Sequence, residues 1–213
     1  MTTMIEPLMA DKLKMWLISL DIIPNDCWEE VEWKMNDHPC WMNVHISDGA
    51  SKICLVFEKL PFVIKWSTND NGEAMQEVDF YEEAKQARLD KLFPTTEYFF
   101  SHNGVDFVVQ EKIQIQAGNL CHSHANKYNN ISRTVPRKMV NLVQKELNKV
   151  SGYRRQISPL WIACVLSIYG KKTTKALCKF VQEHDINDLH ESNVGFLRDK
   201  PIILDFSGYH RED

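Results

Sequence analysis

The sequence predicts an α+β protein with two lobes: an antiparallel sheet with one helix, and a truncated helical part that ends in a β-hairpin. Residues 41–66 form three short apolar runs separated by the turns SDGASK and EKLP. Residues 133–184 change to helical spacing. Residues 194–204 return to two apolar runs around the turn RDK, which predicts a buried hairpin.

Two helices are expected before the sheet. Apolar residues recur at helical spacing between residues 5 and 20. A second helix is expected over residues 24–35, with Pro24 near its start and Asp26 as its N-cap. The chain is therefore expected to contain a helical extension, an N-terminal lobe and a reduced C-terminal lobe, over residues 1–38, 39–116 and 117–213.

The sheet lobe is expected to contain a helix and a second strand pair after its three-stranded meander. Residues 73–93 show helical spacing, with one apolar stripe available for burial. Residues 95–115 predict two strands around the Asn-Gly turn at 103–104. The polar segment 117–132 is expected to be a loop. Helices are then expected over about 133–150, 158–169 and 172–184.

Composition favours a cytoplasmic globular protein. Of the 213 residues, 44% are hydrophobic and 25% are charged, and we expect neither a membrane span nor a secretory signal. Six cysteines without a C-x-x-C pair are expected to be reduced, with Cys54, Cys164 and Cys178 in apolar patterns. The cluster CHSH at 121–124 leaves a metal site open as an alternative, although it lacks a second ligand pair.

Charge is distributed unevenly along the chain. Residues 131–180 contain eleven Lys and Arg residues and one acidic residue, Glu146, in a chain of net charge −4. These side chains are either solvated helix faces or a docking surface for an anionic partner or for the acidic N-terminus. We expect a protein substrate or partner, and no nucleic acid.

Three oxygen-bearing side chains near the C-terminus suggest a catalytic or metal-binding site. Asp188 and Asn193 lie in a loop after a predicted helix, and Asp205 ends the hairpin that begins at Asn193. Because an antiparallel hairpin returns its second strand to the start of its first, Asn193 and Asp205 should be neighbours, with Asp188 on the same rim. Such groups suit Mg²⁺ and an accepting hydroxyl in phosphoryl transfer. The alternative is that they are capping and turn residues.

The motif D-L-x-x-x-N at 188–193, followed by a short hairpin and D-F-x-G at 205–208, resembles the catalytic loop and metal motif of the protein-kinase-like superfamily. The form D-L-H-x-x-N resembles the choline and aminoglycoside kinase branch and small bacterial and bacteriophage kinases. The resemblance implies ATP and Mg²⁺ as cofactors, Asp188 as the catalytic residue, and Asn193 and Asp205 as metal ligands. We assign no catalytic role to His190.

The N-terminal lobe carries the second part of the resemblance. FVIK at 62–65 resembles the V-A-I-K strand of kinases, which implies that Lys65 contacts the phosphates. The following helix should supply a glutamate that pairs with Lys65. Glu77 is the first choice because apolar residues flank it, and Glu82 and Glu83 are alternatives.

The resemblance also implies where a nucleotide would bind. The loop at 47–52 would cover the phosphates through Gly49, Ala50 and Ser51. The strand end VVQEK matches the hinge of the family, so backbone groups near Gln110, Glu111 and Lys112 would meet the adenine.

The chain departs from the family pattern in several places. Gly49 is the single glycine in a loop that is normally glycine-rich, and Ser207 replaces a glycine of the metal motif. Ile186 and Asn187 replace the usual His-Arg, so regulation by activation-loop phosphorylation is not expected. With Asp213 as the last residue, we expect no peptide-binding helices, and we expect the acceptor to dock elsewhere, for example on the basic helices.

The sequence therefore predicts an ATP- and Mg²⁺-dependent phosphotransferase, a minimal Ser/Thr protein kinase. One alternative is a catalytically inactive kinase-like protein that engages or inhibits a protein partner. A small-molecule kinase is the third hypothesis, ranked last because we expect no large helical substrate lobe.

Overall fold

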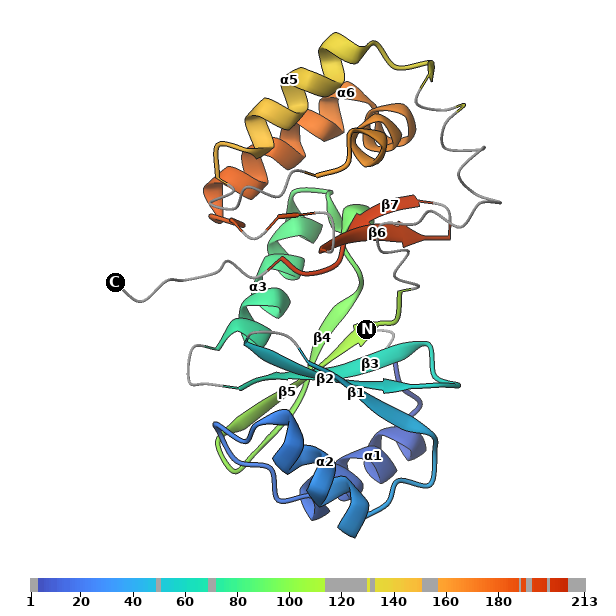
Figure 1. Ribbon diagram of the computed structural model, residues 1–213, viewed down its shortest axis with the longest axis vertical. Helices are drawn as coiled ribbons and strands as arrows, with labels where there is room; N and C mark the ends of the chain where they lie inside the picture. Colours follow the sequence, from blue (N-terminus) through green and yellow to red (C-terminus); the bar gives the residue numbers. More distant parts are fainter. Residues whose placement is uncertain are drawn as a thin grey trace. The chain divides into compact units, whose positions relative to one another are not determined.

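The computed structural model describes residues 4–48, 51–68, 72–113, 130, 133–150, 157–187, 189–190, 193–198 and 200–206. The elements, shown in Figure 1, are α1 (Pro7–Ser19), α2 (Trp28–Asp37), β1 (Val44–Asp48), β2 (Lys52–Phe57), β3 (Phe62–Ser67), α3 (Glu73–Gln86), the 3-10 helix η1 (Asp90–Leu92), β4 (Thr96–His102), β5 (Val105–Glu111), α5 (Arg137–Leu147), α6 (Pro159–Glu183), β6 (Val194–Leu197) and β7 (Lys200–Ile203). The predicted α+β class is confirmed.

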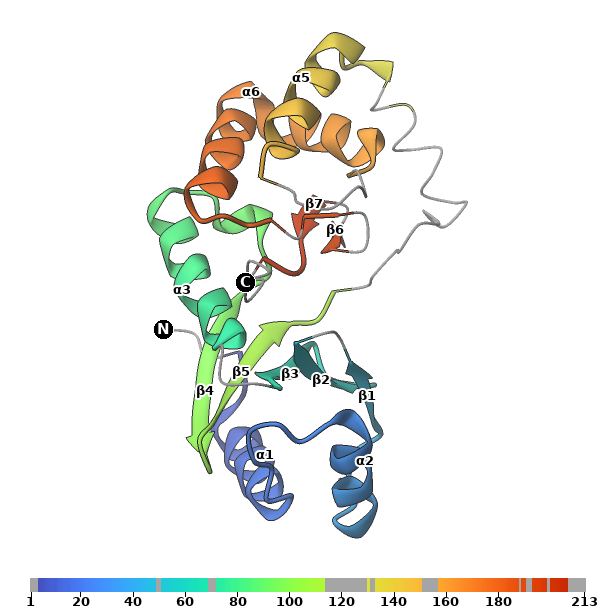
Figure 2. The same ribbon diagram turned by 60° about the vertical axis from the view of Figure 1, so that its left-hand side comes forward.

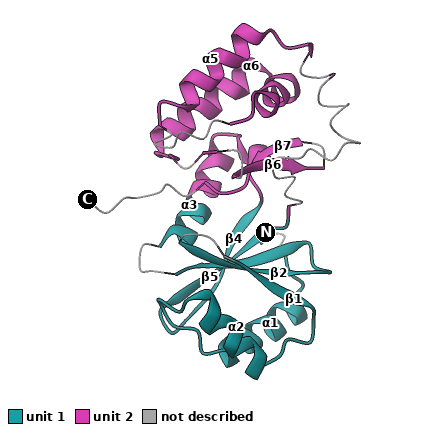
Figure 3. Ribbon diagram, viewed as in Figure 1, with its two compact units in different colours: residues 1–79, 95–112 teal, residues 80–94, 113–213 magenta. Residues whose placement is uncertain are grey.

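The chain divides into two compact units, coloured separately in Figure 3. Unit 1 comprises residues 1–79 and 95–112, and unit 2 comprises residues 80–94 and 113–213. The helices expected over residues 1–38 thus belong to the same unit as the sheet. Helix α3 contributes its first part to unit 1 and its second part to unit 2.

Unit 1 contains a five-stranded antiparallel sheet in the order β1-β2-β3-β5-β4. The first three strands form the predicted meander, and β5 lies between β3 and β4. The predicted Asn-Gly turn joins β4 to β5: His102 pairs with Val105, and both Asn103 (φ 51°) and Gly104 (φ 80°) have positive φ angles. Two such angles define the type I′ turn, which matches the twist of a hairpin.

Gly104→Ala is expected to lower the free energy of unfolding by about 1–2 kcal/mol, because an L-residue with a Cβ is strained at positive φ. An added Cβ would lie 3.5 Å from Pro24 Cγ, an ordinary contact, so the cost comes from the backbone. Gly104→Asn is the matched control and should cost less, because asparagine tolerates this conformation better. Urea unfolding measures both, and an equal loss for the two variants would contradict the turn assignment.

One face of the sheet is apolar and is covered by α1 and α2 (Figure 2). Leu13 and Leu17 of α1 are fully buried, as are Leu55, Phe57 and Phe107 of the sheet. Removal of this apolar surface from water is the main favourable term that holds the helices on the sheet. The N-terminal helices and the sheet therefore share one core.

The start of α2 differs from the prediction. Cys27, not Asp26, is the N-cap, and its N–H donates to the Glu30 carboxylate over 2.8 Å. Asp26 is buried, and its Oδ2 accepts the Ile23 N–H at 2.9 Å and the Lys34 ammonium at 2.6 Å. The Asp26 carboxylate is thus used by the preceding turn and by Lys34 in the last turn of α2, so it does not cap the helix.

Helix α3 ends at Gln86, whereas its spacing predicts a helix to residue 93. Arg88 adopts a positive φ of 60°, and the N–H groups of Arg88 and Leu89 donate back to the carbonyls of Lys85 and Ala84. This is a Schellman motif, which ends a helix in a left-handed residue. Leu89, in the turn that follows the helix, is buried. The apolar spacing of the sequence therefore continues beyond the end of α3.

Unit 2 is built on α5 and α6, which pack together, and on the β6–β7 hairpin. A break at Gly170 (φ 76°, ψ 167°) divides α6, in agreement with the two helices predicted there. This region of conformational space is open essentially to glycine alone. The hairpin is buried as predicted: Trp161 Nε1 donates to the Gly195 carbonyl at 3.1 Å, and Ile202 and Ile203 lie in the core.

Two of the cysteines predicted to lie in the core, Cys164 and Cys178, are buried and free, whereas Cys54 is half-buried. Burial raises the pKa of both Cys164 and Cys178 from 9.0 to about 11. The folded state therefore holds protons that the unfolded state loses above pH 9, so the free energy of unfolding should fall between pH 9 and pH 11. The Cys164→Ala/Cys178→Ala double variant should show a smaller decline in urea titrations, and an unchanged decline would contradict this assignment.

The predicted Cys/His cluster at 121–124 lies outside the described residues. Among the residues that the structure describes, no group of three or more His, Cys, Asp and Glu side chains is placed to hold a metal ion. In the same part of the chain, none of the helices combines the length and apolar character that crossing a membrane requires.

Candidate functional site

The sheet face opposite the apolar core of unit 1 carries polar side chains. Lys65 on β3 pairs with Cys54 on β2, and Lys52 lies two residues before Cys54, so the alternation of the strands places both lysines on this face. Gln110 on β5 pairs with Thr96 on β4 and with Val63 on β3. Val63 lies two residues before Lys65, so Gln110 and Thr96 lie on the same face as the lysines. The strands therefore gather two ammonium groups and two neutral polar groups.

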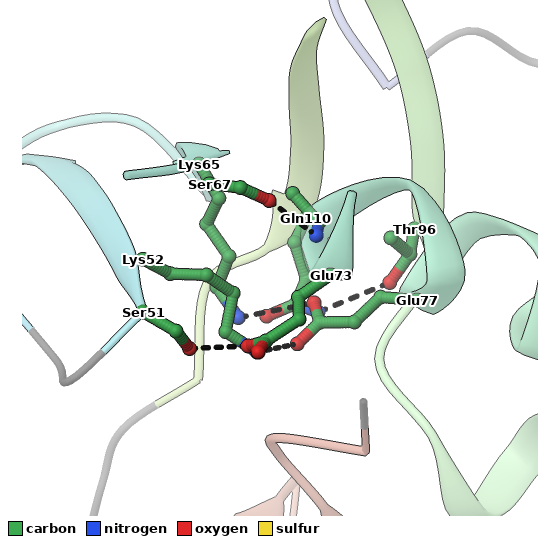
Figure 4. A network of polar contacts seen from close by, with 9 residues as sticks. Ser51, Lys52, Lys65, Ser67, Glu73, Glu77, Thr96 and Gln110 are labelled. Atoms are coloured by element: carbon green, nitrogen blue, oxygen red, sulfur yellow. Dashed lines mark hydrogen bonds and ion pairs between the residues drawn. The ribbon is translucent and has the colours of Figure 1, made fainter. Parts of the chain in front are cut away.

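Helix α3 adds a carboxylate to this face. Glu77 is 0% exposed, and both lysines contact it: Lys65 Nζ lies 3.3 Å from Oε2 and Lys52 Nζ lies 2.8 Å from Oε1 (Figure 4). A buried carboxylate is tolerated only when it is paired in this way. The predicted pairing of Lys65 with Glu77 is therefore present, whereas its role in nucleotide binding stays a prediction.

The two alternative glutamates on α3 have other partners. Glu82 accepts hydrogen bonds from Lys85, and Glu83 lies 3.1 Å from His184 Nε2 within unit 2. Both are more exposed than Glu77. The burial of Glu77 between apolar neighbours, which the spacing of α3 predicts, distinguishes it from the other two.

Gln110 donates a hydrogen bond to Oε2 of the Glu77 carboxylate. Its Nε2 donates to Glu77 Oε2 at 3.0 Å and to Thr96 Oγ1 at 3.1 Å, and both partners are fully buried (Figure 4). The two N–H bonds of the amide are thereby used. The sequence predicted backbone contacts of Gln110 with adenine, whereas its side chain belongs to the network around Glu77.

The first turn of α3 is tied to the sheet next to this network. The Ser51 hydroxyl donates to the Glu73 carboxylate, and the Ala74 N–H donates to Ser67 Oγ at 2.9 Å (Figure 4). The second bond satisfies one of the N–H groups that a helix start leaves without an intrahelical partner. Gly49 and Ala50, predicted with Ser51 to cover phosphates, lie outside the described residues.

Two of the N–H groups at the predicted hinge have partners within the protein. The N–H of Glu111 donates to the Thr95 carbonyl at 2.8 Å, and the N–H of Lys112 donates to the Pro61 carbonyl at 2.7 Å. The Lys112 ammonium donates to the carbonyls of Phe57 and Glu58. These two N–H groups are thus used within the protein, and the expectation that backbone groups near Gln110, Glu111 and Lys112 meet the adenine stays a prediction.

In unit 2 the hairpin brings Asn193 and Asp205 to one end, as predicted. Val194 pairs with Ile203, and the Leu204 N–H donates to the Asn193 carbonyl at 2.8 Å. Asp205 therefore follows the residue that pairs with Asn193, and both side chains are half-buried.

Residues on either side of Asp188, the third predicted site residue, are buried in the core of unit 2. Ile186 is 0% exposed and Leu189 is 1% exposed. The Asn193 N–H donates to the His190 carbonyl at 3.0 Å. Asp188 itself lies outside the described residues, so its predicted place on the rim with Asn193 and Asp205 stays a prediction.

Sequence reasoning missed Lys52, Thr96 and Glu73 as members of the polar network. A signal for Lys52 was present, because it precedes Cys54 by two residues and the strands alternate. Thr96 and Glu73 carried no such signal, since their contacts depend on strand order and on where α3 begins. No family model, curated protein or solved structure matches the chain in the comparisons with known proteins.

Proposed function

We propose that the protein is an ATP- and Mg²⁺-dependent phosphotransferase that acts on hydroxyl groups of proteins. The observation that carries the proposal is the buried ion pair between Lys65, on the third strand, and Glu77, on the helix after it. Protein kinases place a lysine on their third strand and pair it with a glutamate of the following helix, and both must be in place for transfer. The strand, helix and residue types here agree with that arrangement.

The hairpin end in unit 2 supports the second half of the proposal. Asn193 and Asp205 are adjacent through the hairpin register, and their half-buried side chains offer an amide and a carboxylate oxygen. Mg²⁺ binds one or two carboxylates, water and substrate phosphates, so these residues fit the ion. When bound, Mg²⁺ would neutralise charge on the phosphates.

Each remaining residue has one role in the proposal. The Lys65 ammonium would contact a phosphate oxygen, and the Asp188 carboxylate would orient the accepting hydroxyl and take its proton. The basic side chains of α5 and α6 offer a docking surface for an acidic acceptor protein, because opposite charge favours encounter.

The test combines binding and transfer. With ATP and Mg²⁺ at about 100 times the dissociation constant, ligand binding should stabilise the wild type by about 2.7 kcal/mol, and labelled γ-phosphate should appear on protein. Lys65→Met should abolish transfer and reduce the stabilisation to about 1.4 kcal/mol or less. Lys59→Met is the matched control, because Lys59 is an exposed lysine in the turn between β2 and β3.

A wild type that shows neither a melting shift nor transfer would contradict the proposal. A stable partner that co-purifies with such an inert protein would favour the alternative function, a kinase-like binding protein.

A further inference from the structure

Lys52 has no role in the proposed function, yet it makes the shorter contact with the central glutamate. Its ammonium lies 2.8 Å from Glu77 Oε1, and its side chain is 9% exposed. The Lys65 ammonium lies 3.3 Å from Glu77 Oε2, and its side chain is 13% exposed. Kinase chemistry calls for one lysine beside this glutamate, so the second lysine needs a function of its own.

The hydrogen bonds of Glu77 show that the two lysines are not equivalent (Figure 4). Oε2 accepts from both Lys65 and Gln110, whereas among the described residues Oε1 accepts from Lys52 alone. If Lys65 moved away, each oxygen would keep one donor and the carboxylate would keep one cation. If Lys52 moved away, Oε1 would lose its donor in a fully buried site.

The position of Lys52 is also fixed by strand pairing and by the contact of its neighbour in the chain. It is the first residue of β2 and pairs with Ser67 on β3. The preceding residue, Ser51, binds Glu73, which lies one helical turn before Glu77 on α3. Two consecutive residues of the chain therefore bind two consecutive turns of the helix, which fixes the start of β2 on α3.

We propose that the two lysines divide two tasks: Lys52 permanently neutralises and positions Glu77, and Lys65 is the cation released to a polyphosphate ligand. Separating a buried ion pair is costly because it leaves a charge without compensation. With Lys52 in place, Lys65 moves toward a phosphate without that cost. This inference deepens the proposed function and rests on it for the identity of the ligand class.

The first experiment needs no ligand. Lys52→Met is expected to raise the equilibrium constant for unfolding by at least about 100-fold, the lower end of the effect of breaking a buried pair. Lys65→Met is expected to raise it by less than about tenfold, because Glu77 keeps Lys52 and Gln110. Double-mutant cycles with Glu77→Gln in urea should give the larger coupling for the Lys52 pair.

The second experiment measures the affinity of inorganic triphosphate with Mg²⁺ under conditions in which every variant is folded. Lys65→Met should weaken binding by at least about tenfold, the loss expected for one charge-assisted contact. Lys52→Met should also weaken it, because Glu77 then retains Lys65, and Lys52→Arg should restore it. Lys59→Met should bind as the wild type does.

Equal destabilisation by Lys52→Met and Lys65→Met would overturn the division of tasks, whatever the ligand result. Wild-type triphosphate affinity in Lys52→Met would also overturn it, because Lys52 would then be structural only. A wild type that binds neither triphosphate nor ATP would overturn the proposed function and the assignment of Lys65 as a released cation. In that case the stability comparison would still identify the lysine that holds Glu77.

Discussion

Replacing Asp205 with asparagine is expected to lower the rate of γ-phosphoryl transfer by about 100- to 1,000-fold, the loss typical of removing one preorganised charge from a transfer site. Asparagine has nearly the same shape as aspartate, so the hairpin should persist, including the bond from the Leu204 N–H to the Asn193 carbonyl. The substitution removes only the negative charge on which the proposed Mg²⁺ site depends.

Single-turnover transfer from labelled ATP measures this effect. Asp185→Asn is the matched control: Asp185 is exposed in the same unit, and its φ of 47° suits asparagine equally well. Raising the Mg²⁺ concentration should restore part of the lost rate in Asp205→Asn and change nothing in the control. Equal rates in wild type and Asp205→Asn would contradict the assignment of Asp205 as a metal ligand.

Phe206→Ala is expected to lower the free energy of unfolding by about 3–5 kcal/mol, the usual cost of removing a buried phenyl ring. Phe206 is 0% exposed, and its ring centroid lies 5.0 Å from that of Phe93, which in turn lies 5.6 Å from Phe180. The ring anchors the backbone that follows Asp205, so this core position also determines where the carboxylate lies.

Urea unfolding of three variants checks this prediction. Phe206→Leu should lose about half as much as Phe206→Ala, because leucine refills part of the cavity. Leu142→Ala, at a leucine that is 61% exposed in the same unit, should change stability by about 0.5 kcal/mol or less. A loss for Phe206→Ala as small as that for Leu142→Ala would show that the ring does not stabilise the core.

Local rules account for the elements that the sequence predicted well. The meander and the final hairpin follow from alternation, the β4–β5 turn from Asn103 and Gly104, and the division of α6 from Gly170. Each of these features depends on residues close together in the chain. The Lys65–Glu77 pair could also be predicted from the sequence, because a strand and the helix that follows it are adjacent elements.

The features that sequence reasoning missed depend on contacts between distant segments. Aspartate is a favourable N-cap residue, but the Asp26 carboxylate is already bonded to the Ile23 N–H and the Lys34 ammonium. Lys52 meets Glu77 across 25 residues, and Gln110 meets it across 33. Alternation along β2 can indicate which face Lys52 occupies, but the contacts of Lys52 and Gln110 with Glu77 are set by strand order and helix placement.

The central proposal is that Lys65 contacts the phosphates of a nucleotide. An ATP analogue with an acyl group on its terminal phosphate tests it directly, because the nearest lysine amine attacks the acyl carbonyl, forms an amide and releases ATP. Peptide mapping should find the label on Lys65, with less label when ATP and Mg²⁺ are in excess and less in Asp205→Asn. No label on Lys65, or label that competing ATP leaves unchanged, would contradict the claim.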